Sequence, residues 1–470
     1  MPTRRQFLAA AATAASPALR GLAAPAARWN LLVITNDQHR ADCLGCYGNP
    51  VIQTPHTDRL AGEGVRFGRA FVHAPQCVPS RASLHTGRYP HVHRVPTNSY
   101  VLPESEQTLA KVLNENGYRT ACVGEMPFAP RAYTGGFQQV LASNKEYDQF
   151  LAAHGLKFPK TEGPFQAAPV PWTDELDETA FFAGHARDFL KANRDRPFFL
   201  DINFRRPHHP FNPPAPFDKM YLGARFPASH VRPGEMDNKP PQQKAALENS
   251  VGFDLRTMAS ADLDRVKAYY YGMIAENDKY IGTILDELKT QGLDDHTVVV
   301  FNADHGEMLG DHGLLFKGSY MYDGVTQVPL ILRAPGKLPE RTVVDGLVEE
   351  VDVMPTLLEL LGVDVPEGVQ GKSLVPLAHN PKARHKDAVF SEFPAIKMAR
   401  TREWKLVHYT RAKYGELYQL TEDPHELTNL YDDPKYASAR ADMQGILADW
   451  LATSTDPKLA PVRSPDDPPK

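Results

Sequence analysis

Side chains that could take part in chemistry follow three stretches of this 470-residue chain that we expect to be strands. Asp37, His208 and the pair Asp304-His305 each come a few residues after an apolar run. In open α/β sheets ligands bind beyond the carboxyl ends of the strands, so these side chains are expected to converge on one site. Taken singly, each of them could be a solvated loop residue.

A cysteine is expected at the start of a helix. Pro79 suits the first turn of a helix, which would place Cys77 at the positive, hydrogen-bond-donating end. An anion binds naturally at such an end. Arg81 follows two residues after Pro79 and is either part of the same site or a solvent-facing helix residue.

Apolar runs and helical patterns alternate along the part of the chain that carries these residues. The strand-like runs are residues 31–34, 120–123, 198–204 and 297–301, and the helical patterns are residues 55–60, 109–113 and 261–288. This alternation predicts an α/β fold with a large, mainly parallel sheet sandwiched by helices. Residues 213–250 are rich in proline and polar residues, so we expect a long loop over the site.

The pattern changes near residues 378–381. Short segments such as residues 404–407 and 416–420 then suggest a small antiparallel sheet with a closing helix. We therefore expect a catalytic domain over residues 27–380 and a C-terminal α+β subdomain over residues 381–470.

Residues 1–26 have the features of an export signal. Arg4 and Arg5 precede an alanine-rich apolar stretch that ends in small residues, which resembles a twin-arginine signal peptide too short to span a bilayer. We expect a periplasmic or secreted protein that meets the twin-arginine translocase and has no stable membrane anchor. Cleavage would remove three arginines from a chain of formal charge −5, and this acidity argues against nucleic acid as a partner.

Two of the four cysteines, Cys43 and Cys46, form a C-x-x-C pair. A zinc or redox role would need further cysteine or histidine ligands close by. We expect packed thiols, or one disulfide after export.

The run Cys-Val-Pro-Ser-Arg at residues 77–81, continued by Ala-Ser-Leu-His-Thr-Gly-Arg to residue 88, resembles the signature of the sulfatase family. In that family a formylglycine-generating enzyme oxidises the cysteine to formylglycine, whose hydrated aldehyde attacks sulfur. The resemblance spans nearly the whole mature chain. It implies an alkaline-phosphatase-like fold and a hydrolase with a covalent sulfo-enzyme, in which Arg81 would hold the oxyanion formed from the aldehyde.

A second run, residues 302–313, resembles the metal motif of the same family. The resemblance implies a metal site made of Asp37, Gln38, Cys77, Asp304 and His305. Hard carboxylate oxygens favour Ca²⁺ over zinc, with Mg²⁺ or Mn²⁺ as alternatives, and Gln38 stands where many relatives have a second aspartate. By the same resemblance, Lys317 would neutralise the non-bridging oxygens of the substrate.

The run Arg-Arg-Pro-His-His-Pro-Phe at residues 205–211 resembles the Pro-His-x-Pro pattern of the family. The resemblance implies that His208 protonates the leaving alkoxide, and such general-acid help is typically worth ~10²–10⁴ in rate. His209 is the second choice for this role.

One departure from the family changes the charge of the expected site. Relatives usually carry Lys-x-His where this chain has Glu125, Met126 and Pro127. Either Glu125 points away from the site, or the substrate brings a compensating positive group. Some relatives that hydrolyse phosphonate monoesters or phosphate diesters also depart here, and Asn98 lies where such enzymes place a polar substrate contact.

The sequence therefore predicts a metal-dependent sulfuric ester hydrolase that acts on a small-molecule or saccharide sulfate ester. A formylglycine-dependent phosphonate monoester hydrolase or phosphodiesterase is the first alternative. A non-catalytic exported binding protein on a sulfatase scaffold is the second. Residues 157–173 and 213–250 are the expected specificity loops, and they match no pattern that identifies the substrate.

Overall fold

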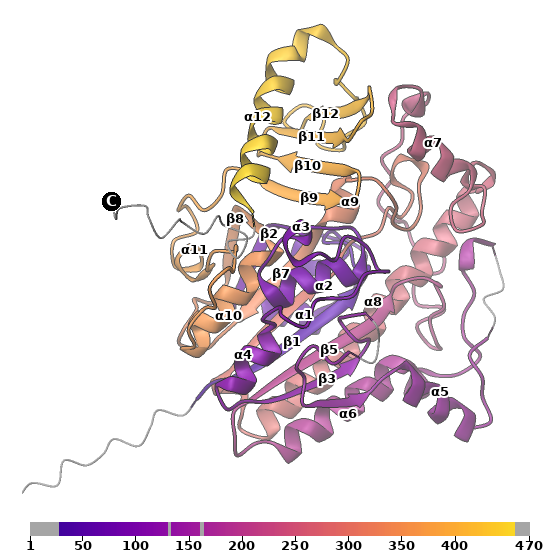
Figure 1. Ribbon diagram of the computed structural model, residues 1–470. Helices are drawn as coiled ribbons and strands as arrows, with labels where there is room; N and C mark the ends of the chain where they lie inside the picture. The colour runs from indigo at the N-terminus through magenta and orange to yellow at the C-terminus, as the bar shows by residue number, and fades with distance from the viewer. Residues whose placement is uncertain (1–27, 130–132, 160–163, 456–470) are drawn as a thin grey trace, which may run out of the picture.

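A mixed eight-stranded sheet with helices on both faces dominates the computed structural model, which describes residues 28–129, 133–159 and 164–455 (Figure 1). Its strands are β1 (Asn30–Asp37), β2 (Val65–Phe71), β3 (Arg119–Gly124), β4 (Gln139–Ala142), β5 (Phe198–Pro207), β6 (Thr297–Ala303), β7 (Gln327–Arg333) and β8 (Thr342–Glu349). They lie in the order β4-β3-β5-β1-β6-β7-β2-β8. Only β7 runs antiparallel to its neighbours among these strands of the described chain.

Both faces of this sheet are buried, which explains why its strands read as unbroken apolar runs. Along β1, Leu31 and Val33 belong to one apolar core, whereas Leu32 and Ile34 belong to another. The first core includes residues of α2 (Cys77–Thr86), α4 (Leu109–Glu115), α10 (Val353–Leu361) and α11 (Val375–His379). The second includes residues of α1 (Pro55–Gly62), α5 (Asn144–Ala153), α6 (Glu178–Ala192) and α8 (Ser260–Thr290). The predicted α/β fold with a mainly parallel sheet is confirmed.

The parallel strands bring their carboxyl ends to one edge of the sheet. Asp37 ends β1, His208 follows β5, Asp304 follows β6 and Glu125 follows β3. These four strands are neighbours in the sheet, so side chains far apart in the sequence meet there. Helix α2 begins beside the same edge, at Cys77.

A second, four-stranded antiparallel sheet follows in the chain and has the order β12-β11-β10-β9. Its strands are β9 (Val389–Phe393), β10 (Ile396–Arg400), β11 (Trp404–Tyr409) and β12 (Gly415–Gln419). The closing helix α12 (Ala437–Thr453) lies across this sheet (Figure 1). Its Trp450 stacks on Phe390 of the small sheet, with ring centroids 4.6 Å apart, and meets Tyr89 of the large unit edge-on at 5.2 Å. The small C-terminal antiparallel sheet is thus confirmed.

The prediction of a long loop over residues 213–250 is wrong for part of that segment. Residues 241–248 form a helix, α7 (Pro241–Glu248). Half of its residues are polar, and its Gln243 anchors it by donating to Glu416 at 3.0 Å. The other short helices are α3 (Pro90–His93), α9 (Asp323–Thr326) and the 3-10 turns η1 (Gly45–Tyr47), η2 (Pro164–Gln166), η3 (Asp174–Leu176), η4 (Glu235–Asn238), η5 (Leu255–Thr257), η6 (Asp294–His296), η7 (Asp311–Gly313), η8 (Glu350–Asp352) and η9 (Pro434–Tyr436).

The expected signal peptide, residues 1–26, lies outside the described residues, so export stays a prediction. Among the residues that are described, no helix combines the length and the apolar character needed to cross a membrane. Cys43 and Cys46 are both free thiols rather than a disulfide.

Gly124 is the residue at which β3 turns into the site, and we predict that Gly124→Ala destabilises the protein by about 3 kcal/mol. Its φ is +90°, and an added Cβ would lie 2.1 Å from the backbone oxygen of Asn203. Gly155→Ala is the matched control, because Gly155 also has a positive φ of +71° but has nothing within 4 Å of an added Cβ. It should cost only about 1 kcal/mol. Urea unfolding of both variants measures the difference, and equal losses would contradict the prediction.

Candidate active site

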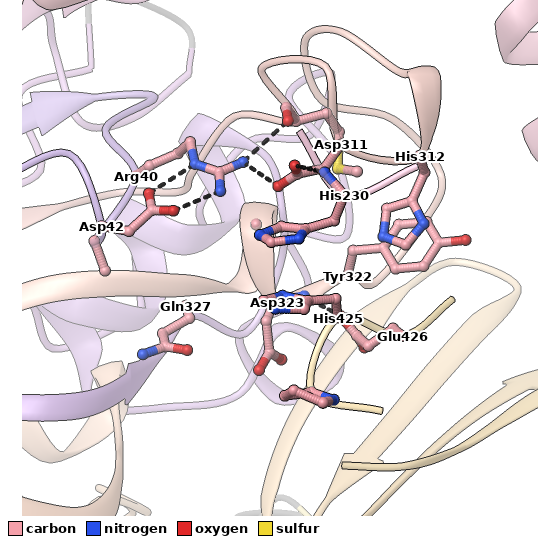
Figure 2. A pocket seen from close by; sticks show the side chains of 14 residues that line it. Arg40, Asp42, His230, Asp311, His312, Tyr322, Asp323, Gln327, His425 and Glu426 are labelled. Atoms are coloured by element: carbon pink, nitrogen blue, oxygen red, sulfur yellow. Dashed lines mark hydrogen bonds and ion pairs between the residues drawn. The ribbon is translucent and has the colours of Figure 1, made fainter. Parts of the chain in front are cut away.

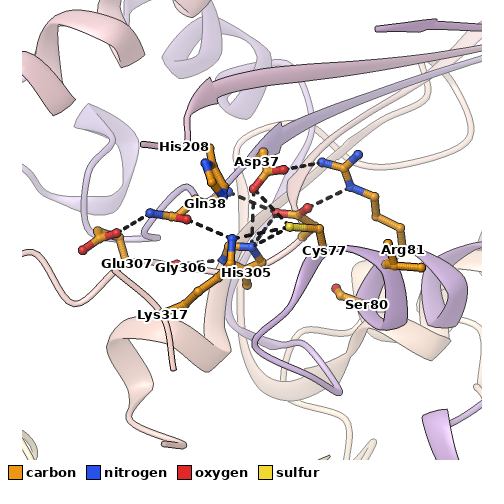
Figure 3. Close-up of polar contacts among 12 residues, drawn as sticks. Asp37, Gln38, Cys77, Ser80, Arg81, His208, His305, Gly306, Glu307 and Lys317 are labelled. Atoms are coloured by element: carbon orange, nitrogen blue, oxygen red, sulfur yellow. Dashed lines mark hydrogen bonds and ion pairs between the residues drawn. The ribbon is translucent and has the colours of Figure 1, made fainter. Parts of the chain in front are cut away.

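Cys77 lies at the centre of a cluster that joins four segments of the chain (Figure 3). Its Sγ is 3.4 Å from Nε2 of His305, 3.4 Å from Nζ of Lys317 and 3.7 Å from Oδ1 of Asp37. Cys77 is the first residue of α2, and Gln76 before it has extended backbone angles. The sequence therefore puts the sulfur where the free N–H groups of the helix favour an anion.

Arg81 lies one turn further along α2 and connects the ends of β1 and β6. Its Nε donates to Oδ2 of Asp304 at 2.8 Å, and its Nη2 donates to Oδ2 of Asp37 at 2.8 Å. All three side chains are buried. Burial alone would raise the pKa of Asp37, but His208 and Arg81 hold that pKa well below its ordinary value. Both aspartates are thus fixed through Oδ2, and Oδ1 of each lies near Nε2 of His305.

The remaining donors form a pocket for a cation. One ligand atom from each of Asp37, Cys77, Asp304 and His305 lies within 4.8 Å of the others. His305 donates from Nδ1 to the backbone oxygen of Gly306 at 2.9 Å, which leaves Nε2 to face the two carboxylates. Two carboxylates, an oriented imidazole and the group at position 77 fit a divalent cation.

The electrostatics of His305 agree with this fit. Burial and Lys317 would lower the pKa of His305, but Asp304, Cys77 and a hydrogen bond to Asp37 raise it to about 10. The negative groups therefore attract a positive charge to this point of the cluster.

Gln38, a predicted metal ligand, is held by contacts on both ends of its amide. Its Oε1 accepts from Nζ of Lys317 at 3.0 Å, and its Nε2 contacts Glu307 and lies 3.1 Å from Nδ1 of His209. The backbone N–H of Gln38 donates to Oδ1 of Asp304 at 3.1 Å. Gln38 therefore orients Lys317 and Asp304, and its role as a metal ligand stays a prediction.

His208 and His209 have different surroundings although their rings stack at 4.1 Å. His208 lines the cavity above Cys77, whereas His209 packs on Phe316 with ring centroids 4.5 Å apart. Loss of hydration and the charge of Lys317 lower the pKa of His208 well below its ordinary value. The charge of a bound anion would favour protonation of this imidazole.

The cavity above Cys77 has a volume of about 1060 Å³. Asn98 lies at its wall, and its Oδ1 accepts from the backbone N–H of Val78 at 3.0 Å in the first turn of α2. Glu125 also lines the cavity. Its Oε2 is 3.7 Å from Nη2 of Arg81, and its Oε1 accepts from Nδ2 of Asn144 at 3.2 Å. Glu125 therefore faces the cavity and Arg81, and whether it contacts a substrate stays a prediction.

A second cavity, of about 240 Å³, lies between the loop after β6 and the C-terminal subdomain (Figure 2). Arg40 in its wall pairs with Asp42 at 2.7 Å and with Asp311 at 2.8 Å, and it donates to the backbone oxygens of Glu307 and Met308. These charges are already paired with each other. Arg40 therefore holds the loop that carries Asp304 and His305 in place.

Sequence reasoning missed several polar residues around the cluster. Glu307 lies inside the run that predicted Asp304, and burial raises its pKa. Glu350 accepts from the hydroxyl of Ser80 at 2.8 Å beneath α2. Glu178 and Asn144 line the large cavity from α6 and α5. Among these residues, only Glu307 could have been found from the sequence, because it lies inside residues 302–313, the run that resembles the metal motif.

Comparisons with known proteins agree with the geometry. Residues 29–363 match the family model described as Sulfatase, and residues 310–452 match the model of the N-sulphoglucosamine sulphohydrolase C-terminal region. The chain is 31% identical to an arylsulfatase of Clostridium perfringens, over 87% of this chain and 91% of that protein. It is 29% identical to a multifunctional alkaline phosphatase superfamily protein of Trinickia caryophylli, over 93% of this chain and 98% of that protein.

Among solved structures, the phosphonate monoester hydrolase of Agrobacterium radiobacter superposes with a TM-score of 0.83 at 30% sequence identity. The match covers 92% of this chain and 97% of that one. The alkaline-phosphatase-like architecture predicted from the sequence is thereby confirmed.

The donor cluster predicts that a divalent cation stabilises the folded protein. Calcium at about a hundred times its Kd should add about 2.7 kcal/mol and raise the thermal unfolding temperature. Asp304→Asn should abolish this shift, because it removes a ligand charge from the cluster. Asp295→Asn, on the exposed turn η6, is the matched control and should keep it. An equal shift in the Asp304 variant would contradict the assignment.

Proposed function

The chain belongs to the sulfatase family, and from this premise we propose that it hydrolyses a sulfate ester to sulfate and an alcohol with a nucleophile made from Cys77. The observation that carries the proposal is the position of Sγ of Cys77, 3.4 Å from Lys317 and 3.4 Å from His305, at the N-terminus of α2. A small-molecule or saccharide sulfate ester is the expected substrate.

Two groups that the family implies would complete this site. When present, formylglycine at position 77 would supply a hydrated aldehyde oxygen that attacks sulfur, and a divalent cation, with Ca²⁺ as the first choice, would supply positive charge beside it. Asp37, Asp304, His305 and residue 77 would hold that cation.

The positive side chains of the chain bind the anionic end of the substrate. Lys317 reaches the reacting atom at position 77 and would neutralise charge on the sulfuryl oxygens as it develops. Arg81 is occupied by Asp37 and Asp304, so its main contribution is to orient these two carboxylates.

His208 is the group placed to protonate the departing alcohol. An alkoxide is a poor leaving group, so a proton delivered to its oxygen lowers the barrier. Nδ1 of His208 is hydrogen-bonded to the backbone oxygen of His209, which leaves Nε2 as the nitrogen that can carry the transferred proton.

A phosphonate monoester or a phosphate diester is the second candidate substrate, and Glu125 is the observation that favours it. The Glu125 carboxylate lies 3.7 Å from Arg81, where it would repel a third non-bridging oxygen. A sulfate ester has that third oxygen, whereas a phosphonate monoester has a carbon substituent instead. The likeness to a phosphonate monoester hydrolase supports the same alternative.

Mass spectrometry of the tryptic peptide that covers residues 70–81 tests the nucleophile. Protein made together with a formylglycine-generating enzyme should give this peptide with formylglycine or its hydrate at position 77. Peptides that contain Cys43 or Cys122 serve as internal controls, because both thiols are buried and should stay unmodified. Recovery of unmodified Cys77 alone would rule out this nucleophile.

Turnover of three esters separates the two candidate functions. An aryl sulfate, an aryl phosphonate monoester and a phosphate diester with the same aryl leaving group should be compared by kcat/KM. We expect the sulfate to be hydrolysed fastest, because Lys317 and the cation site provide positive charge for its oxygens. A preference above about tenfold for either phosphorus ester, equal to roughly 1.4 kcal/mol, would reverse the ranking.

A further inference from the structure

The wall of the large cavity is acidic beyond the reaction centre, although the substrate must bring an anion. Its ionisable side chains there, among the described residues, are the acids Glu125, Glu146, Asp148 and Glu178 and the bases Lys145 and Arg205. Acids outnumber bases two to one in this part of the cavity. An anionic ester with an uncharged alcohol gains nothing from such a wall.

Glu125 is fixed at the point where this wall meets the reaction centre. Its backbone N–H donates to the backbone oxygen of Asn203 at 3.0 Å, and its side chain is held by Asn144 at 3.2 Å. The side chain is only 20% exposed. Its cationic neighbour Arg81 already serves Asp37 and Asp304, so three carboxylates share one guanidinium.

Glu178 extends the acidic surface into the cavity from the first residue of α6. Nε of Arg206 lies 4.0 Å from Oε1 of Glu178. The same guanidinium forms shorter ion pairs with Asp177, at 2.6 Å, and with Glu276, at 3.2 Å. Burial raises the pKa of Glu178 to about 7, against the opposing charges of Arg205 and Arg206. With a pKa of about 7 the Glu178 carboxyl is only partly ionised in the free protein, and a cation bound beside it would favour the anionic form.

Aromatic and apolar side chains complete this part of the cavity. Phe158 and Tyr147 line it together with Met126. The guanidinium of Arg205 lies over the ring of Phe158, with Cζ 5.7 Å from the centroid, so a cation already occupies one face of this ring. Carboxylates beside aromatic faces are the surroundings that recognise organic cations.

We propose that the alcohol part of the substrate carries an organic cation, a protonated amine or a quaternary ammonium, and that Glu125 and Glu178 bind it within the large cavity. This inference rests on the proposed sulfate ester hydrolysis and specifies its substrate class. The ester would then be a zwitterion, with its sulfuryl end at Lys317 and its cationic end at Glu125. The charge at position 125, which disfavours an ordinary sulfate ester, becomes the means of selecting this one.

Matched esters test the proposal on the complete modified enzyme. Choline sulfate and 2-aminoethyl sulfate carry the cation, and 3,3-dimethylbutyl sulfate is the uncharged carbon analogue of choline sulfate. We expect kcat/KM for at least one cationic ester to exceed that for the uncharged ester by at least about tenfold. A preference for choline sulfate would identify a quaternary ammonium as the bound cation, and a preference for 2-aminoethyl sulfate would identify a protonated amine.

Glu125→Gln should reduce this preference at least about tenfold, since it removes the charge and keeps the shape. Differences in intrinsic reactivity between the esters cancel when the same ratio is compared in the variant and the wild type. Glu115→Gln, at the exposed end of α4, is the matched control and should keep the wild-type ratio. Equal use of charged and uncharged esters, or an unchanged ratio in the Glu125 variant, overturns the inference.

Binding of the product alcohols gives a second readout that does not need turnover. Choline or 2-aminoethanol should bind the wild type at least about tenfold more tightly than 3,3-dimethylbutanol in calorimetry, and Glu125→Gln should abolish the difference. Hydrolysis of the uncharged ester without any preference for a cation would overturn the inference and leave the proposed function intact. Failure to hydrolyse any sulfate ester would overturn the proposed function, and with it the inference that rests on it.

Discussion

The buried guanidinium of Arg81 is the interaction on which the site depends. It donates to one oxygen of Asp37 and to one oxygen of Asp304, and so ties α2 to the ends of two neighbouring strands. Without this charge, two buried carboxylates would face each other at close range. Cys77 precedes Arg81 by four residues and therefore lies on the same face of the helix. One side chain thus fixes the sulfur, both carboxylates and the helix in a single arrangement.

Buried polar networks of the same kind support the other strand ends, where the backbone leaves the sheet and loses its ladder of hydrogen bonds. Arg206, next to the histidine pair, pairs with Asp177 and Glu276. Arg40 holds the backbone that follows β6. These ion pairs and hydrogen bonds hold the loops that carry the reactive groups in place. This is the preorganisation that electrostatic catalysis needs.

The sequence predicted what depends on local pattern and could not predict what depends on distant contacts. The apolar run of β1 and the polar residues after β1, β5 and β6 are local signals, and parallel pairing then brings those residues together. The direction of Glu125 depends on Asn144, which comes from another helix, so a pattern around residue 125 contains no sign of it. The amide of Gln38 is likewise occupied by Lys317 and Glu307, which only the folded loop brings near. Helix α7 was missed because it is short and because the hydrogen bonds of its buried Gln243 depend on partners far away in the sequence.

The central place of β1 in the large sheet has a consequence for how the chain can fold. The first strand of the described chain pairs with β5 on one side and with β6 on the other, and Asn30 contacts Thr297 across 267 residues of sequence. As the chain emerges from the ribosome, this strongly apolar strand therefore stays unpaired until β5 and β6 have been synthesised. Topologies with such long-range pairings fold slowly and expose apolar surface in the meantime. The pairing that brings the strand ends together at the site thus makes the assembly of that site a late event in folding.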